Sequence, residues 1–280
     1  MSKKKRTTFL VVWVCALVAL LAISLLTAEP DSHTESIQVT MKDAVLHEVN
    51  QINLFGLKEV NPGLISAYVI TAILLAAALL IRIFAIPRFK IVPGRFQTLI
   101  ESWVGLFDKL AKSNSPHRNG FLGAYIFAAG TYIFTSTLFE LFGLQGLTTA
   151  GGSISLPAPL SDINAAIALG CMSYLVILSG GIIGNGLSGV GKTLKDFSLP
   201  ISMSFRLFGA MLSGLLVTEL VYYYVSLSFV LPVIVGVMFT LLHALIQAYV
   251  LTMLTALFYG EVSEKTETPK KAKEPKKNKK

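Results

Sequence analysis

Six long apolar stretches constrain this chain more than any other feature of its sequence. Each holds about 20 residues or more, the length at which an α-helix crosses a hydrocarbon core of about 30 Å. Hydrophobic residues make up 53% of the 280 residues, and charged residues make up only 14%. We therefore predict an all-α integral membrane protein. The stretches lie at 9–28, 64–86, 121–144, 163–184, 199–225 and 229–259.

The basic residues predict how these spans are oriented. If six spans alternate in direction, most of the 24 Lys and Arg residues fall in segments on the same side of the membrane. Cytoplasmic loops carry an excess of Lys and Arg, so we expect that side, and both termini, to be cytoplasmic. The net charge of +8 then reflects topology and does not indicate nucleic-acid binding. The basic segments are 1–8, 82–118, 185–198 and 261–280.

Both ends of the chain are basic, but they differ in expected structure. Residues 1–28 place four basic residues before an apolar run, which fits either a retained membrane anchor or a signal peptide. Leu-Thr-Ala at 26–28 is a poor cleavage site, which favours a retained helix. Residues 29–62 are rich in Asp and Glu and are expected to form an extracytoplasmic segment. Residues 263–280 are rich in lysine and are expected to form a disordered cytoplasmic tail.

A segment between the second and third spans is predicted to form an amphipathic helix at residues 95–112. Its apolar side chains recur at helical spacing, and charged and polar side chains take the opposite face. Pro93 and Gly94 precede the helix and Pro116 follows it. Such a helix is expected to lie in the cytoplasmic interface, as a surface anchor or a docking site. The apolar face comprises Phe96, Leu99, Ile100, Trp103, Leu106, Phe107 and Leu110.

Two further patterns do not predict a cofactor or a metal. Cys15 and Cys171 lie within apolar spans and lack the spacing of metal ligands. The run from Gly186 to Thr193 fits the phosphate-loop pattern, but that motif works between a strand and a helix of an α/β domain. No soluble stretch here is long enough to build such a domain. We interpret the glycines as a tight turn and Lys192 as one of the charges that face the cytoplasm.

Arg206 is the strongest functional signal, because it is a permanent cation inside an apolar span. Such a charge at membrane depth costs about 2.5–3.5 kcal/mol on insertion scales, and it is kept where function or a partner requires it. Ala210, Ser213 and Gly214 are small residues close to the same helix face. Small residues let a neighbouring helix approach closely. The pattern therefore predicts a partner helix, and an anion, opposite Arg206.

Three more polar residues lie on the last two spans. Glu219 is thirteen residues after Arg206, about 20 Å further along the helix, and therefore cannot form a simple salt bridge with it. His243 and Gln247 share one face of the sixth span, and the reversed direction of that span brings His243 to the depth of Glu219. The group fits an aqueous path or a proton relay. The alternatives are a glutamate that reaches the outer interface and a histidine that only packs.

Four motifs carry a family resemblance. They are Ser-Phe-Arg-Leu-Phe-Gly-Ala-Met at 204–211, Ala-Leu-Ile-Gln-Ala-Tyr-Val at 244–250, Pro-Leu-Ser-Asp-Ile-Asn at 159–164 and Pro-Gly-Arg-Phe-Gln at 93–97. Over about residues 45–262 the chain resembles subunit a of F-type ATP synthases, the stationary ion-channel subunit of the membrane sector. The order of the arginine and glutamine motifs is the most specific part of this resemblance.

The resemblance implies a fold and a mechanism. Residues 63–262 would be the ion-translocating domain, with a five-helix core, long fifth and sixth helices, and the first span as an addition. Arg206 would attract a carboxylate of the rotating c-ring and keep two half-channels separate. Gln247 would position the arginine, Glu219, His243 and Ser213 would line the ion path, and Asp162 and Asn164 would contribute polar surface near its mouth.

The same resemblance implies partners and a location. The partners would be c-ring subunits, peripheral stalk b subunits, the remaining ATP synthase subunits and the lipid bilayer, with no nucleic acid. The subunit would make no chemical bond itself and would need no cofactor. A bacterial plasma membrane is the simplest setting. Glu219 with His243 favours H⁺ over Na⁺ as the transported ion.

Departures from the family pattern leave the channel lining open. The family usually has Asn where this chain has Ala210, and Glu or His where it has Leu215; an acidic residue or His often stands where it has Thr240. A secondary transporter that holds an anionic substrate on Arg206 is the main alternative. A purely structural membrane scaffold is a second.

Overall fold

The computed structural model describes residues 52–54, 57–117, 119–147, 153–223 and 231–265. Five helices in this part of the chain are long and apolar enough to cross a membrane. They confirm the five predicted spans from 64 onward. The predicted span at 9–28 lies outside the described residues, as do most of the predicted extracytoplasmic segment at 29–62 and most of the tail at 263–280. The five segments are Pro62–Arg88, Gly120–Phe142, Ile163–Asn185, Ser198–Val217 and Gly236–Ser263.

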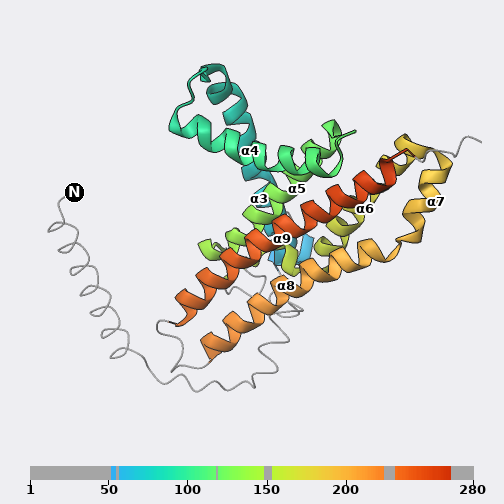
Figure 1. Ribbon diagram of the computed structural model, residues 1–280. Coiled ribbons are helices and arrows are strands. Elements are labelled where there is room, and N and C mark those ends of the chain that lie inside the picture. Colours follow the sequence, from blue (N-terminus) through green and yellow to red (C-terminus); the bar gives the residue numbers. More distant parts are fainter. Residues whose placement is uncertain (1–51, 55–56, 118, 148–152, 224–230, 266–280) are drawn as a thin grey trace, which may run out of the picture.

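In the described part of the chain, regular structure is helical apart from two short hairpins (Figure 1). The hairpins pair β1 with β2 and β3 with β4, both antiparallel. The α-helices are α3 (Pro62–Leu80), α4 (Arg95–Asn114), α5 (Gly120–Phe139), α6 (Ile163–Asn185), α7 (Leu187–Lys195), α8 (Ser198–Tyr223) and α9 (Leu231–Ser263). The short elements are η1 (Ile81–Ala85), η2 (Ile86–Arg88), η3 (Glu140–Phe142), η4 (Pro159–Ser161), β1 (Ile52–Leu54), β2 (Leu57–Val60), β3 (Gln145–Leu147) and β4 (Ser153–Ser155).

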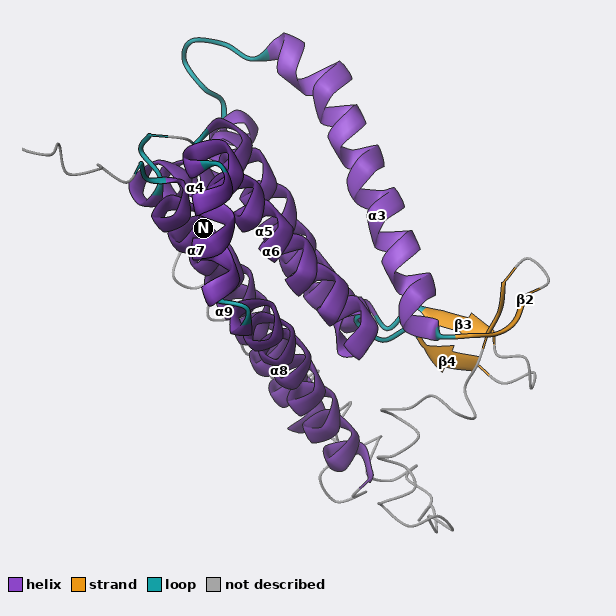
Figure 2. Ribbon diagram, turned by 90° about the vertical axis from the view of Figure 1, so that its right-hand side faces the viewer, coloured by secondary structure: helices purple, strands orange, loops and turns teal. Residues whose placement is uncertain are grey.

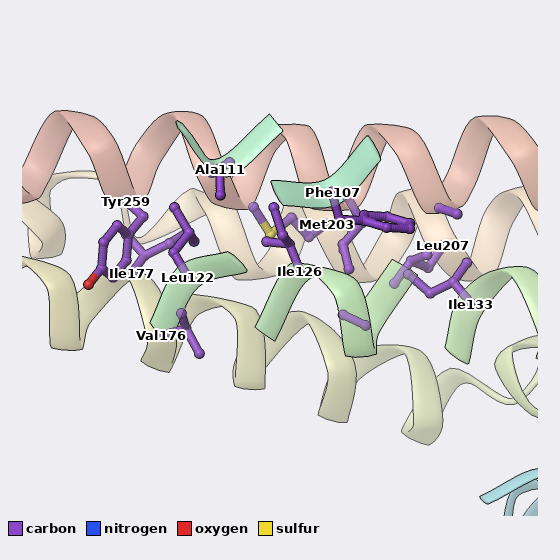
Figure 3. Close-up of a cluster of buried hydrophobic side chains, with 14 of the residues drawn as sticks. Phe107, Ala111, Leu122, Ile126, Ile133, Val176, Ile177, Met203, Leu207 and Tyr259 are labelled. Atoms are coloured by element: carbon purple, nitrogen blue, oxygen red, sulfur yellow. The ribbon is translucent and has the colours of Figure 1, made fainter. Parts of the chain in front are cut away.

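The helices α5, α6, α8 and α9 form one bundle, and α3 stands apart from it (Figure 2). Buried side chains from α4, α5, α6, α8 and α9 lie in a continuous row between these helices (Figure 3). In contrast, α3 touches the bundle mainly through its first turns, where Ser66 and Ile70 are buried. Most of α3 is therefore left for contact with lipid or with another chain.

Glycines set how closely the bundle helices approach. A Cβ at Gly180 of α6 would overlap the Tyr259 ring of α9, and one at Gly184 would overlap the backbone of Ser263. Small residues at helix crossings are the usual way in which helices pack tightly in lipid. At the end of the same interface, the Asn185 side-chain amide donates to the carbonyl oxygens of Val262 (2.9 Å) and Glu264 (2.7 Å). These contacts fix the end of α9 against α6.

The predicted amphipathic helix exists, at Arg95–Asn114, and packs along the bundle by one part of its apolar face. Phe107 is buried between α5 and α9, in an edge-to-face contact with Phe127. Trp103 donates from Nε1 to Thr131 Oγ1 at 3.0 Å. Phe96 and Leu99, at the start of the helix, are instead exposed. The later part of the apolar face of α4 thus packs on the bundle, while its first turns stay exposed.

The phosphate-loop pattern falls on a helix. Only Gly186 has the positive φ (58°) of a tight turn, while the rest of the pattern forms α7. Our interpretation of all its glycines as a turn was therefore wrong. Gly189 packs against the backbone of Gly181, and the Thr193 hydroxyl donates to the Gly189 carbonyl oxygen at 3.0 Å. The segment folds back along α6 as a helical hairpin, with helices on both sides in place of a strand.

Candidate functional site

Arg206 lies on an exposed stripe of α8 together with small residues. Ser202, Gly209 and Ser213 are exposed on the same face, one to two helical turns on either side of the arginine. A Cβ at Gly209 would meet no atom of the described chain within 4 Å. The Ser213 hydroxyl donates to the Ala210 carbonyl oxygen at 2.8 Å. Apart from Arg206, the stripe therefore carries only small side chains, and it is open to a partner.

The surface around this stripe is apolar. Ile201 and Phe205 are exposed on α8, and Leu242, Ile246 and Tyr249 are exposed on the neighbouring α9. Within the described part of the chain, Arg206 forms no ion pair and donates no hydrogen bond. A guanidinium among apolar side chains at membrane depth is costly unless an anion meets it. No side chain that the structure describes supplies such an anion.

The buried side of α8 fixes the position of Arg206. Met203 and Leu207 are buried on either side of it, and Ser204 packs against Gly170 of α6. The Ser204 hydroxyl donates to the Pro200 carbonyl oxygen at 2.7 Å, which leaves no unsatisfied donor in this contact. The helix is thus anchored to α6 within two residues of the arginine.

The way α8 and α9 are aligned sets the order of the other predicted residues along the two helices. His243 of α9 lies opposite Gly214 of α8, because a Cβ at Gly214 would be 3.7 Å from His243 Nδ1. The two helices run antiparallel (Figure 1). At 1.5 Å per residue, Glu219 is about 7.5 Å beyond the level of His243, Gln247 about 6 Å on the other side, and Arg206 about 12 Å on that side. The four residues therefore follow one another along the hairpin.

Gln247 differs from Arg206 in exposure. Its side chain is 6% exposed, on the face of α9 that carries the buried Ala244 and Ala248. No hydrogen bond between Arg206 and Gln247 occurs among the described residues, although their levels differ by only about 6 Å. The predicted positioning of the arginine by Gln247 stays a prediction. His243 is half-buried, with its ring 5.8 Å from that of Phe239.

Asp162 joins the starts of two helices. Its Oδ1 accepts from the Asn164 backbone amide at 2.8 Å, which caps α6. Its Oδ2 accepts from the Asn61 side-chain amide at 2.8 Å, and Asn61 in turn caps α3 by accepting from the Gly63 amide at 2.8 Å. The side chain of Asn164 is exposed. Both residues thus lie at the end of the bundle where α3 and α6 begin.

Two comparisons with known proteins show which family the chain belongs to. The family description ATP synthase A chain matches residues 65–260, which is more than half of the chain. This chain belongs to that family. ATP synthase subunit a from Cereibacter sphaeroides strain ATCC 17025 is 26% identical over 206 residues, covering 69% of this chain and 78% of the relative. The protein of the same name from strain ATCC 17029 gives the same identity and coverage. As a member, the chain is a multi-pass membrane protein of the ATP synthase membrane sector.

Some residues of the site were not predicted from the sequence. Gly214, which we expected to receive a partner helix, faces His243 within the chain, and Ser202 and Gly209 are exposed in its place. Their spacing from Arg206 (four and three residues) is a signal that could have found them. Asn61 was also missed, although Asn-Pro-Gly before an apolar run is a typical helix start. Among the described residues, no cluster of His, Cys, Asp and Glu could hold a metal ion.

Proposed function

We propose that this chain is the stator subunit a of an F-type ATP synthase, in which Arg206 faces the carboxylates of a rotating c-ring. Family membership supports the stator ion-channel role. The single observation that best supports the finer role is the exposed stripe of Ser202, Arg206, Gly209 and Ser213. Each passing carboxylate would pair with Arg206, and the fixed cation would prevent ions from crossing directly between two half-channels.

The properties of the stripe fit a moving partner better than a fixed one. Small side chains on both sides of Arg206 offer no knob that would lock a helix in one register. The apolar surroundings strengthen the attraction between the guanidinium and a carboxylate, because the local dielectric constant is low. The c-ring carboxylates would thus supply the anion that the described chain does not.

The ion path would run along the α8–α9 hairpin toward Arg206. Glu219, His243 and Gln247 follow one another at steps of about 6 to 7.5 Å, distances that water molecules and side-chain movements can bridge. Ser213 adds an exposed hydroxyl beside this path. Asp162 and Asn164 would give polar surface where the bundle meets the outer face. The ion would be H⁺, because a histidine beside a glutamate suits proton transfer.

The energetic role follows from the membrane potential. One elementary charge crossing 100 mV releases about 2.3 kcal/mol, so several ions have to pass for each ATP that the complex makes. This subunit would convert the descent of ions into rotation and would make no bond itself. Its other partners would be the peripheral stalk b subunits and the remaining subunits, in a bacterial plasma membrane with both termini cytoplasmic.

A secondary transporter that binds an anionic substrate at Arg206 is less well supported. It would need a cavity in which Arg206 could hold a small anion, whereas the arginine is exposed on an open helix face. Such a transporter would also work without other subunits. Transport by the purified single chain would favour it over the stator role.

Disulfide cross-linking in the whole complex tests the proposed orientation. Cysteines would replace Ser202, Gly209 or Ser213 in turn, against one cysteine next to the ion-binding carboxylate of the c subunit, in a background where Cys15 and Cys171 are serine. We expect oxidation to link all three positions to the c subunit. Cysteines at the buried Met203 and Leu207 are the matched controls and should not link.

Two results would decide against this orientation. Links at 203 and 207 in place of the three exposed positions would mean that α8 turns a different face to the ring. Complete absence of links, in a complex that pumps normally, would mean that α8 does not face the ring at all.

A further inference from the structure

The connection between α3 and α4 exposes large apolar side chains next to basic ones. We call residues 82–99 the basic elbow. Ile91 is 103% exposed and Val92 is 82% exposed, the most exposed apolar pair along this connection. Phe96 and Leu99 extend the exposed apolar surface onto the first turns of α4. None of these side chains packs on the bundle.

The elbow has a defined conformation in spite of its exposure. Gln97 holds the backbone of Lys90 from both sides: its Nε2 donates to the Lys90 carbonyl oxygen (2.9 Å), and its Oε1 accepts from the Lys90 amide (3.0 Å). Glu101 Oε1 accepts from the same Gln97 Nε2 at 2.7 Å, which orients the amide. The tip formed by Ile91 and Val92 therefore projects from a fixed base.

The charge of the elbow has one sign. Residues 82–100 contain no Asp or Glu, and the first acidic side chain after them, Glu101, is bonded to Gln97. Arg88 uses Nη1 to donate to the Phe84 carbonyl oxygen at 2.7 Å, which leaves its other N–H groups for a ligand. The basic side chains are Arg82, Arg88, Lys90 and Arg95, all exposed.

The length of the second predicted span places the elbow at a membrane surface. Arg82 follows Pro62 by twenty residues, or about 30 Å of helix, which equals the thickness of the hydrocarbon core. If α3 begins at one surface, Arg82 reaches the phosphate level of the other. The apolar tip then lies beyond the core, where it would be exposed to water unless it enters the interface.

We propose that the basic elbow binds the anionic phospholipid headgroups of the cytoplasmic leaflet, with Ile91 and Val92 inserted among the acyl chains near them. The four basic residues complement the negative charge of phosphatidylglycerol or a similar lipid. The apolar tip adds hydrophobic contact with the acyl chains below the headgroups. Through its hydrogen bonds to Lys90, Gln97 holds the apolar tip in a fixed position beside the basic residues. The contact would anchor the cytoplasmic end of α3, which has little support from the bundle. The inference needs only the membrane topology and does not depend on the ion path.

Lipid quenching in the reconstituted complex tests this proposal. An Ile91→Cys variant, in a background where Cys15 and Cys171 are serine, would carry bimane at position 91. The complex would be placed in phosphatidylcholine vesicles that contain equal fractions of doxyl-labelled phosphatidylglycerol or doxyl-labelled phosphatidylcholine. We expect quenching in both, and several-fold stronger quenching by phosphatidylglycerol, since one basic residue near an anionic surface contributes about fivefold in binding.

Variants that remove charge then test whether the basic residues of the elbow cause the preference for phosphatidylglycerol. Arg88→Gln with Arg95→Gln removes two of the four basic side chains of the elbow and should clearly weaken the preference for phosphatidylglycerol. Lys109→Gln with Lys112→Gln removes the same charge further along α4 and should leave the preference unchanged. ATP-driven proton pumping, measured on the same vesicles, reports separately on the proposed function.

Three outcomes would overturn the proposal. Absence of quenching by either lipid would mean that another subunit covers the elbow. Equal quenching by both lipids in the unchanged elbow would mean that the contact has no preference for anionic headgroups. A preference for phosphatidylglycerol that is undiminished in the Arg88 and Arg95 variant would place the binding site elsewhere.

Discussion

Replacing Gly170 by alanine should displace α8 next to Arg206. The added Cβ would overlap Ser204 Oγ and would lie 3.0 Å from the Pro200 carbonyl oxygen and 3.2 Å from the Ser204 amide nitrogen. The hydroxyl can rotate away, although it then loses its hydrogen bond to Pro200. The two backbone atoms cannot, so α8 has to move by a few tenths of an ångström.

The expected size of the effect follows from this overlap. Overpacking of a tight core costs about 1–3 kcal/mol. For a domain of roughly 200 residues each kcal/mol corresponds to about 2–4 °C, so the temperature at which pumping is lost should fall by about 5 °C. The assay is ATP-driven proton pumping after heating, normalised to the amount of assembled complex.

Two variants control for this result. Gly105→Ala adds the same methyl group to α4 where it meets nothing within 4 Å, and it should be neutral or slightly stabilising. Ser204→Ala on top of Gly170→Ala removes the hydroxyl overlap and should recover part of the loss. The reasoning is refuted if Gly170→Ala resists heat as well as Gly105→Ala does.

Three further predictions concern separate contacts. Gly209→Leu should leave the chain itself stable, because the described chain offers no clash at this position, but should abolish pumping through collision with the c-ring; normal pumping would place Gly209 away from the rotor. Asn61→Ala removes a helix cap and the bond to Asp162 and should lower stability by about 1–2 kcal/mol, measured as earlier heat inactivation, while Asn61→Ser should restore the cap alone. Asn185→Ala loses both bonds to the end of α9 and should cost about 1–3 kcal/mol, whereas the exposed Asn164→Ala should have a smaller effect on heat resistance.

Much of the fold could be predicted because lipid leaves few choices. A backbone in hydrocarbon has to satisfy its own polar groups, so each long apolar run becomes a helix. The second and fourth predicted spans agree with Pro62–Arg88 and Ile163–Asn185 to within two residues at each end. The amphipathic helix at 95–112 was also predicted correctly, because its period of apolar residues is visible without knowledge of its neighbours.

Contacts between helices could not be predicted in the same way. Whether Gly214 faces a partner or His243 depends on how α8 is rotated against α9, and an apolar span shows little difference between its faces. The same holds for Gly170, whose contact with Ser204 requires knowing that α6 and α8 are neighbours. The bond between Asn61 and Asp162 joins residues 101 positions apart, and nothing local in either segment points to it.

The part of the candidate site that the sequence predicted best is the charged residue, because a charge inside the membrane costs free energy. Arg206 stood out because a guanidinium in an apolar span is rarely kept without a function. The order of His243 and Gln247 along the hairpin followed from helix geometry and the reversed direction of the last span. The level of His243 did not, because it lies opposite Gly214, about 7.5 Å short of the level of Glu219 that we predicted for it. The exposed stripe did not follow, since Ser202 and Gly209 resemble ordinary packing residues until the structure shows which side of α8 is open.

The most direct test of the central claim is ATP-driven proton pumping by the reconstituted complex with Arg206→Ala, at an assembly level matched to wild type. The account predicts that the complex assembles and that coupled pumping is lost, because the gate between the half-channels has lost its charge. Undiminished coupled pumping in the assembled variant would contradict the account and would leave Arg206 with a role in packing or topology.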